Sequence, residues 1–486
     1  MIIAIEKNKK IEFGDFQTPK ELADEVCQKL VEIGISPKYV IEPTCGLGTF
    51  LESATQTLVN VEKFIGVEVN PEYYSELSIR SKTFPLSERI EIKEGDFFKF
   101  DWNTLLKELK GEILVLGNFP WVTNAVQGTI GGVNLPQKTN FQNHRGYDAL
   151  TGKSNFDISE FMLIKVAEWF QYHPGHLAML VKTSVARKFL GHLHKTNKEV
   201  SGSAIYHIDA MKYFGAAVDA CLLYCRFDPL SHNYDYDVFD SLSSQTHYRV
   251  GHRQGVTVKD LDAFEKFGYL FGSSNEKWRS GIKHDCSEVM ELTEKEGNLF
   301  NGLGELVDIE TNFIYPLVKG SDVANNRILN TNRFMLVTQK MVGESTKSIK
   351  TIAPKTWAYL ESHAKYLDAR KSKIYQNNPR FSIFGVGTYT FTPWKIAICG
   401  LYKNLNFRLV GQIHNKPVVC DDTVYLLGFE NHEEVKKVYD FLYQEDTQKF
   451  LSALIFWDDK RPIKTSILNS LKLNTQTPMI HQQKLF

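Results

Sequence analysis

The chain has 486 residues, of which 43% are hydrophobic and 23% charged, and its 57 Lys and Arg balance 57 Asp and Glu. This length predicts two or three domains of about 100–200 residues each, and the composition excludes a disordered or fibrous chain. The opening residues MIIAIEKNKK are too charged for a signal peptide, and no apolar run reaches the roughly 18 residues of a membrane span. We therefore expect a cytoplasmic protein without a membrane partner.

The seven cysteines are scattered and odd in number, which is typical of a reducing compartment rather than of a disulfide framework. Cys221 and Cys225 lie in an apolar run, where we expect core thiols. His284 and Cys286 are close in sequence, but no second cluster with zinc-ligand spacing accompanies them. The sequence therefore predicts no metal site.

Between residues 38 and 227, runs with the continuous apolar character of buried strands alternate with helical stretches. The predicted strands are 38–43, 63–69, 89–95, 112–118, 176–182 and 220–227. Apolar residues at three- and four-residue spacing predict helices over 49–59, 71–80 and 157–171. Strands that alternate with helices predict an α/β, Rossmann-like domain with a mostly parallel sheet.

The first predicted strand runs into a glycine loop, IEPTCGLGTF. Gly46 and Gly48 allow the backbone to approach a nucleotide-like ligand at the carboxyl end of this strand. The loop lacks the third glycine of the dinucleotide fingerprint and the Lys-Ser/Thr pair of a phosphate loop, so phosphate binding is disfavoured. The neighbouring residues expected to line the same ligand are Glu42, Pro43 and Cys45.

The second and third predicted strands each end in an acid. Glu68 follows Gly46 by 22 residues and can accept hydrogen bonds from a ribose diol, with Val69 beside it. Asp96 can accept from an adenine amino group while Phe97 covers the ring. Taken alone, each acid is better explained as a helix cap or a solvated turn. Three consecutive strand ends with fitting groups favour an adenosine site without a phosphate, which is what S-adenosyl-L-methionine requires.

The fourth predicted strand ends in Asn118, Phe119, Pro120 and Trp121. This stretch resembles the Asn-Pro-Pro-aromatic motif of amino-group methyltransferases, especially the adenine-N6 DNA methyltransferases of type II restriction–modification systems. Two acceptors, the Asn118 side-chain oxygen and the Phe119 carbonyl, would grip the hydrogens of an exocyclic amine, which is a poor nucleophile on its own. Pro120 restricts the residue before it and so directs that carbonyl. Trp121 would stack on the flipped base, and Phe119 departs from the motif by replacing its first proline.

The resemblance extends to segments on either side of this motif. Residues 16–26 resemble the segment that precedes the first strand in the gamma-like class, where cofactor motifs come before the recognition domain. This implies that Thr18 and Pro19 close over the methionine end of the cofactor. It also implies that Phe161 lines the cofactor pocket and that Phe214 lies opposite Trp121, against the target base.

A segment rich in Gly, Asn and Gln follows the motif, over residues 122–155. A loop this long inside a compact domain is typical of a lid. We expect it to order over the cofactor and an adenine flipped out of duplex DNA. Lys138, Arg145 and Lys153 are its candidate phosphate contacts.

Polar residues dominate 228–255, where we place the junction between a catalytic domain (1–250) and a target-recognition domain (251–486). Short strands and isolated helices that do not alternate regularly predict a mixed α+β fold for the second domain. The first part holds 26 Lys and Arg against 31 Asp and Glu, and the second 31 against 26, which fits a polyanion partner or an ordinary solvated surface. Basic residues that intermix with aromatics there are expected to contact DNA phosphates: Lys371, Lys373, Arg380 and Lys464.

These features together predict an S-adenosylmethionine-dependent methyltransferase that modifies adenine N6 in a specific sequence of double-stranded DNA. We expect a monomer or weak dimer that works beside a separately encoded restriction endonuclease. One alternative is an RNA or protein-glutamine methyltransferase with the same Asn-x-Pro-aromatic logic, against which the large C-terminal domain and the Thr-Pro segment argue. The other is a catalytically inactive DNA-binding specificity subunit, which Phe119 would suit.

Overall fold

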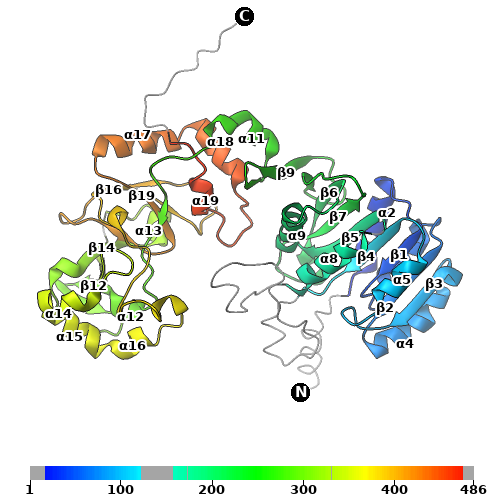
Figure 1. Ribbon diagram of the computed structural model, residues 1–486, viewed down its shortest axis with the longest axis horizontal. Helices are drawn as coiled ribbons and strands as arrows, with labels where there is room; N and C mark the ends of the chain where they lie inside the picture. Colours follow the sequence, from blue (N-terminus) through cyan, green and yellow to red (C-terminus); the bar gives the residue numbers. More distant parts are fainter. Residues whose placement is uncertain (1–16, 122–156, 172, 330, 474–486) are drawn as a thin grey trace, which may run out of the picture. The chain divides into compact units, whose positions relative to one another are not determined.

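The computed structural model describes residues 17–121, 157–171, 173–329 and 331–473. By its internal contacts the chain divides into two compact units, Met1–Leu261 and Asp262–Phe486. Each unit has its own sheets and its own buried core (Figure 1).

A ten-stranded sheet with the order β10-β9-β8-β6-β7-β5-β4-β1-β2-β3 forms the first unit. Its parallel part consists of β1 (Tyr39–Glu42), β2 (Lys63–Glu68), β3 (Ile90–Glu94), β4 (Ile113–Asn118) and β5 (Gly175–Lys182). β1 is central, with Ile41 opposite Ile65 of β2 on one side and Val115 of β4 on the other. The strand order reverses at β1, and ligands of open α/β sheets bind at the carboxyl ends of strands next to such a switch point.

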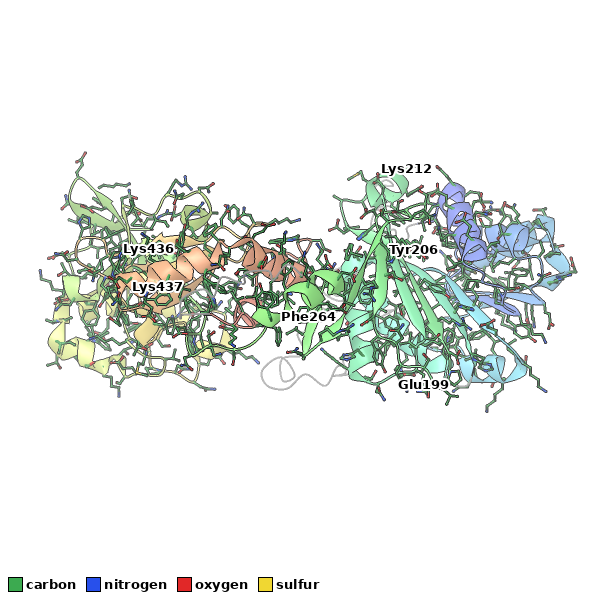
Figure 2. The ribbon with its side chains drawn as sticks, turned by 90° about the horizontal axis from the view of Figure 1, so that it is seen from above. Glu199, Tyr206, Lys212, Phe264, Lys436 and Lys437 are labelled. Atoms are coloured by element: carbon green, nitrogen blue, oxygen red, sulfur yellow. The ribbon has the colours of Figure 1, made fainter. Side chains whose placement is uncertain are left out.

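The antiparallel strand β7 (Ala220–Phe227) separates β5 from β6 (Gly202–Ile208). With β7 reversed beside the parallel strands, the sheet has the Rossmann-like α/β arrangement of S-adenosylmethionine-dependent methyltransferases, which confirms the expected fold class. The next strand in the sheet after β6 is β8 (Tyr236–Phe239). Tyr206 of β6, which Figure 2 marks, stacks on Phe239 of β8 with ring centroids 4.6 Å apart.

The polar segment in which the sequence analysis places the domain junction belongs to this sheet. It carries β8 and β9 (His247–Arg253), and β10 (Val256–Val258) follows directly. The division into compact units therefore falls after Leu261 rather than after residue 250. β9 has only two buried residues among seven, so its apolar signal is too weak to be recognised by continuous hydrophobicity.

Helices cover both faces of the sheet. One face carries α2 (Lys20–Glu32), α3 (Thr49–Thr57) and α4 (Pro71–Arg80), and the other carries α5 (Trp102–Glu108), α8 (Ile158–Trp169) and α9 (Thr183–Lys195). The short α10 (Ala210–Phe214) precedes β7. Local sequence sets several starts: Asn70 accepts from the Glu72 N–H ahead of Pro71, and Asp157 accepts from the Ser159 N–H.

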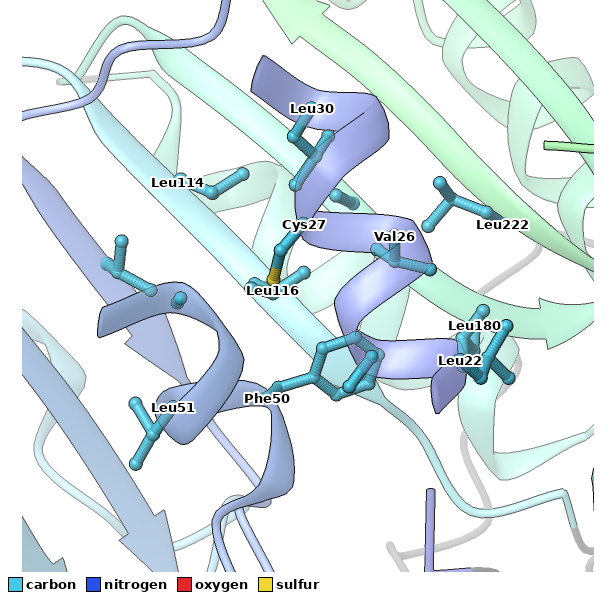
Figure 3. Packing of buried hydrophobic residues seen from close by; sticks show 14 of the residues in the cluster. Leu22, Val26, Cys27, Leu30, Phe50, Leu51, Leu114, Leu116, Leu180 and Leu222 are labelled. Atoms are coloured by element: carbon cyan, nitrogen blue, oxygen red, sulfur yellow. The ribbon is translucent and has the colours of Figure 1, made fainter. Parts of the chain in front are cut away.

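The main core of the first unit lies between α2, α3 and the sheet (Figure 3). α2 contributes Leu22, Val26 and Leu30, which recur at four-residue spacing and are fully buried. β4 directs Leu114 and Leu116 towards these helices, while Val115 points to the opposite face and is also fully buried. Each such side chain contributes about 1.5–3 kcal/mol through burial, which is why strands covered on both faces appear as unbroken apolar runs.

The second unit is a mixed α+β structure with two sheets. One has the order β11-β19-β16-β17 and consists of β11 (Arg279–Ser280), β16 (Trp394–Cys399), β17 (Arg408–Val410) and β19 (Val424–Phe429). The other has the order β13-β12-β15-β14-β18 and consists of β12 (Glu291–Lys295), β13 (Asn298–Asn301), β14 (Ile314–Val318), β15 (Arg333–Leu336) and β18 (Val419–Cys420).

Its helices are mostly short. They are α11 (Leu261–Phe267), α12 (Ser287–Met290), α13 (Gly320–Ala324), α14 (Ile349–Ile352), α15 (Pro354–Ser362), α16 (Ala364–Asp368), α17 (His432–Leu442), α18 (Glu445–Leu454) and α19 (Thr465–Leu468). Figure 2 marks Lys436 and Lys437 on α17, the longest of them. Within the described ranges, no helix is long and apolar enough to cross a membrane.

All seven cysteines are buried free thiols. Cys221 and Cys225 lie in the core as expected, and burial raises the pKa of each thiol to about 12. His284 accepts a hydrogen bond from the Cys286 N–H at 3.1 Å and contacts Glu291 through Nε2 at 3.3 Å. Among the residues placed by the structure, no group of three or more potential metal ligands occurs.

Candidate active site

The glycine loop that follows β1 makes a tight turn before α3. Gly46 and Gly48 have φ angles of 50° and 75°, in the left-handed region. A Cβ on Gly48 would lie 2.3 Å from Cδ1 of Leu77, and the Gly48 N–H donates to the Cys45 carbonyl at 2.7 Å. Backbone geometry therefore favours glycine at both positions, and a side chain at Gly48 would also require Leu77 to move.

Glu68, at the end of β2, closes this loop. Its carboxylate accepts hydrogen bonds from the N–H groups of Gly46 and Asn70, both at 2.7 Å. Because each carboxylate oxygen has two acceptor positions, these bonds orient Glu68 without exhausting its capacity. Val69 follows and is partly exposed. The predicted pair of glycine loop and acid is thus brought together.

Glu42, at the end of β1, is fully buried. Its Oε2 accepts from the Leu51 N–H at 3.2 Å, and its Cγ would lie 3.4 Å from a Cβ on Gly117. Burial, reinforced by the nearby Glu68 carboxylate, raises the pKa of Glu42 well above its usual value. Pro43 is buried, and burial raises the pKa of the Cys45 thiol as well. These three side chains support the loop from inside.

Asp96 lies just after β3, where its side chain organises a turn. Oδ1 accepts from the Phe98 N–H at 2.9 Å, and Oδ2 lies 3.2 Å from Lys99 Nζ. The Lys99 and Phe100 N–H groups both donate to the Asp96 carbonyl. The structure thus shows the turn-capping role that was weighed for this acid, and the second acceptor positions of its carboxylate remain for a ligand.

The rings after β3 divide between the core and the partly exposed surface. Phe97 is buried and contacts Phe119 edge to face at a centroid distance of 5.8 Å. Phe98 is partly exposed, and its ring centroid lies 5.9 Å from that of Phe161 on α8. Phe98 and Phe161 thus offer more accessible ring surface than Phe97, whose role at the ligand stays a prediction.

Asn118 ends β4 beside the start of α2. Its Nδ2 donates to Thr18 Oγ1 at 3.4 Å, and Thr18 is buried just before Pro19, the residue that caps α2. With the amide nitrogen directed to Thr18, Oδ1 is the group's acceptor. The contact joins residues 100 positions apart in sequence and brings together the Thr-Pro segment and the Asn-Phe-Pro-Trp motif.

The Phe119 side chain packs inside the protein. Only 1% of this residue is exposed. The cluster around it continues from Phe97 to Trp102 and Trp169, whose centroids lie 4.5 Å apart. Phenylalanine in place of the motif's first proline thus fills a hydrophobic cluster. Its main-chain carbonyl is an acceptor, as that of proline would be.

Trp121 and Phe214 meet as the resemblance implied. Their ring centroids are 5.0 Å apart and the planes cross at 68°. Trp121 is only 5% exposed and its indole N–H donates to the Leu180 carbonyl at 3.4 Å, whereas Phe214 on α10 is partly exposed. The two rings form an aromatic corner in which Phe214 offers more accessible surface.

Two charged residues next to this motif escaped the sequence analysis. Lys182 Nζ, at the end of β5, donates to the Trp121 carbonyl at 3.0 Å and to Asp157 Oδ2 at 2.7 Å. Asp157 also accepts from the Ser159 hydroxyl at 2.6 Å. A lysine that ends an apolar run and an aspartate that opens a helix are detectable signals, but nothing in the sequence pairs them.

The predicted DNA contacts are only partly described. Lys138, Arg145 and Lys153 lie outside the described residues. In the second unit Arg380 pairs with Asp368 and Lys464 with Asp459, both at 2.8 Å. Lys371 and Lys373 are exposed. The structure therefore places these four cations on the second unit without showing what they bind.

Two type II methyltransferases are similar to this chain in sequence, one of them along nearly its whole length. The type II methyltransferase M.NspV of Nostoc sp. (strain ATCC 29411 / PCC 7524) is 53% identical over 481 residues, which cover 99% of this chain and 100% of that protein. The type II methyltransferase M.CvrRI of Paramecium bursaria Chlorella virus XZ-6E is 29% identical over 119 residues, 24% of this chain and 27% of that protein. No protein-family model matches the chain.

Solved structures are similar at a lower level. The type IIL restriction–modification enzyme MmeI in complex with DNA aligns with a TM-score of 0.48 and 14% identity, over 87% of this chain and 60% of that chain. A putative class I S-adenosylmethionine-dependent methyltransferase from Listeria monocytogenes aligns with a TM-score of 0.32 and 17% identity, over 47% of this chain and 67% of that chain.

The Rossmann-like sheet and the residues at its carboxyl edge define an S-adenosylmethionine-dependent methyltransferase. Similarity over the full length of M.NspV then gives the family: the chain belongs to the type II methyltransferases, the DNA methyltransferases of restriction–modification systems. The expected cofactor and enzyme class are confirmed at this level.

Proposed function

We propose that this chain transfers a methyl group from S-adenosylmethionine to the N6 amino group of an adenine within a specific sequence of double-stranded DNA. One observation carries the proposal. The Asn-Phe-Pro-Trp motif ends β4 beside the β1 loop, whose Gly46 N–H is held by Glu68 of β2. The residues that we propose to grip the amine and those that we propose to bind adenosine thus follow the carboxyl ends of neighbouring parallel strands.

Asn118 and Phe119 would activate the amine. The lone pair of an exocyclic amine is delocalised into the ring, and attack on a methyl group requires a more tetrahedral nitrogen that becomes positive. The Asn118 Oδ1 and the Phe119 carbonyl accept the two amine hydrogens, which favours that geometry and stabilises the developing charge. Pro120 keeps Phe119 in an extended conformation, so its carbonyl direction is set before the base arrives.

The residues at the edge of β1, β2 and β3 fit S-adenosylmethionine. When bound, this cofactor supplies an electrophilic methyl group. The Glu68 carboxylate can accept from ribose hydroxyls, and Asp96 can accept from the adenine amino group. Phe98 and Phe161 supply ring surface for the adenine. Thr18, fixed by Asn118, marks the side on which the methionine end would lie.

Phe214 and Trp121 would receive the target base. An adenine in a duplex must leave the stack to reach Asn118, and stacking on an aromatic ring returns about 1–3 kcal/mol per base. Trp121 is held edge to face against Phe214, so the corner they form is ordered before binding. The second unit, with its exposed basic residues, is the proposed target-recognition domain.

Sequencing the methylation of DNA from cells that express this chain tests the proposal most directly. We expect N6-methyladenine at one defined sequence and protection of that sequence from a cognate nuclease. Methylated cytosine, or label from radioactive cofactor in RNA or glutamine alone, would refute the adenine assignment. Cofactor binding without any methylated product would instead support an inactive specificity subunit.

Asn118→Ala provides the matched test of mechanism. We expect transfer to fall below detection while S-adenosylmethionine still binds, because the substitution removes an acceptor for the amine and leaves the β1 and β2 loops intact. Isothermal titration and a filter assay measure the two quantities on the same preparation. A variant with the wild-type rate would show that Asn118 is not catalytic.

A further inference from the structure

The turn over residues 340–344 in the second unit exposes two apolar side chains at its tip. Met341 and Val342 are 60% and 50% exposed. Gly343 follows with φ of 83°, and Glu344 Oε2 accepts from the N–H groups of Lys340 and Met341 at 2.7 and 3.2 Å. The turn is thus internally hydrogen-bonded, and the two apolar side chains at its tip do not pack in the core.

Buried side chains fasten the turn to the segment 380–383. Gln339 is only 2% exposed; its Oε1 accepts from the Ile383 N–H at 2.8 Å and its Nε2 donates to the Glu344 carbonyl. On the far side, the Thr346 hydroxyl donates to the Arg380 carbonyl at 2.6 Å. Both ends of the turn are therefore anchored, which lowers the entropy cost of presenting the tip to a ligand.

Basic residues flank this turn in sequence and occur on the segment to which it is anchored. Lys340, Lys347 and Lys350 lie on or beside the turn, and Lys371, Lys373 and Arg380 lie on the segment that leads to its anchor. Arg380 pairs with Asp368, whereas none of the five exposed lysines has a carboxylate of the described residues within ion-pair distance. Unpaired lysines can bind phosphates without first breaking an ion pair.

We propose that the turn 340–344 is a DNA-contacting wedge, in which Met341 and Val342 insert at a base step of the recognised duplex while the neighbouring lysines neutralise phosphates. Apolar side chains on architectural proteins insert between base steps in this way. A tip of two residues is smaller than the apolar patches of several hundred Å² that mark protein interfaces, and its basic surroundings complement a polyanion. The inference rests on the proposed function and deepens it by naming the residues that touch bases.

The test uses the full chain, with a short fluorescein-labelled duplex that contains the sequence methylated by the wild type and a second duplex without it. The double variant Met341→Ala/Val342→Ala is expected to bind the first duplex at least about tenfold more weakly and the second nearly unchanged, as for a base contact. Lys347→Ala/Lys371→Ala is expected to weaken both duplexes alike and to reduce the salt slope by about one per lysine. Leu306→Ala, which truncates an exposed apolar side chain outside the turn, is the control and should bind both duplexes as wild type does.

The possible results distinguish a failure of the wedge from a failure of the proposed adenine methylation. If the wild type methylates DNA and the Met341/Val342 variant binds its sequence within twofold of wild type, the wedge is refuted and the function stands. Equal weakening on both duplexes by that variant would also refute a base contact. If the wild type methylates no adenine at all, the proposed function itself fails.

Discussion

Lys182→Met removes the ammonium group that joins the end of the Asn-Phe-Pro-Trp motif to α8. Nζ lies 3.0 Å from the Trp121 carbonyl and 2.7 Å from Asp157 Oδ2, and the side chains of Lys182 and Asp157 are 20% and 7% exposed. Methionine keeps most of the apolar stem of lysine. The substitution therefore deletes two hydrogen bonds and leaves a nearly buried carboxylate without its cation.

The expected loss of stability follows from these contacts. Hydrogen bonds to charged groups contribute about 1.5–3 kcal/mol, and breaking a buried ion pair by removing one partner costs about 3–5 kcal/mol. Partial exposure of Lys182 and the remaining bond from Ser159 to Asp157 reduce the second figure. We expect about 2–3 kcal/mol less stability, and a kcat reduced about 10- to 100-fold because the motif is no longer held in place.

Urea unfolding and single-turnover methylation measure the two effects, with cofactor affinity by titration calorimetry as the control. Asp157→Asn and the double variant Lys182→Met/Asp157→Asn complete a thermodynamic cycle, since asparagine removes the unpaired charge. We expect the double variant to recover stability relative to Lys182→Met but not to recover kcat. An unchanged rate in Lys182→Met, or stability effects that simply add, would refute the positioning role of Lys182.

Substitutions at three further positions have distinct expected effects. Glu68→Ala should weaken S-adenosylmethionine binding at least about tenfold in calorimetry, because it removes the proposed ribose acceptor and the partner of the Gly46 N–H; wild-type affinity would contradict that role. Phe119→Ala should cost about 3–5 kcal/mol in urea unfolding, and Phe119→Leu clearly less; equal stabilities would show that the ring is not a packing element. Burial lowers the pKa of Lys395 from 10.5 to about 8. The buried charge therefore lowers the free energy of unfolding by its full amount below pH 8, and this loss disappears as the pH rises towards 10.5. Lys395→Met should therefore be more stable than wild type at pH 7. A difference in the free energy of unfolding that stayed constant up to pH 10.5 would be evidence against the lowered pKa of Lys395.

Much of the fold of the first unit follows from local patterns. The predicted strand 112–118 is observed as Ile113–Asn118, and the predicted helix 71–80 as Pro71–Arg80. Buried parallel strands are apolar on both faces, so their signal is strong. β6 (Gly202–Ile208) was missed because only its three central residues are buried and its ends are partly exposed.

Site residues were predictable where position along a strand decided them. Glu68 and Asn118 end parallel neighbours of β1, so topology alone brings them to one edge of the sheet. The burial of Phe97 was harder to foresee, because it depends on whether the aromatic cluster of Phe119 accepts this ring. That choice is made by packing, which one-dimensional periodicity does not record.

The sequence by itself determined the class of this protein: an α/β sheet whose strand ends carry a glycine loop, an acid and an Asn-Phe-Pro-Trp motif. Those features are local, since each is written in a few consecutive residues. Tertiary structure alone decided how the motif is held, through Thr18 on Asn118 and Lys182 on the Trp121 carbonyl. Such contacts join residues 100 and 61 positions apart, and folding, not local propensity, sets which distant polar groups meet.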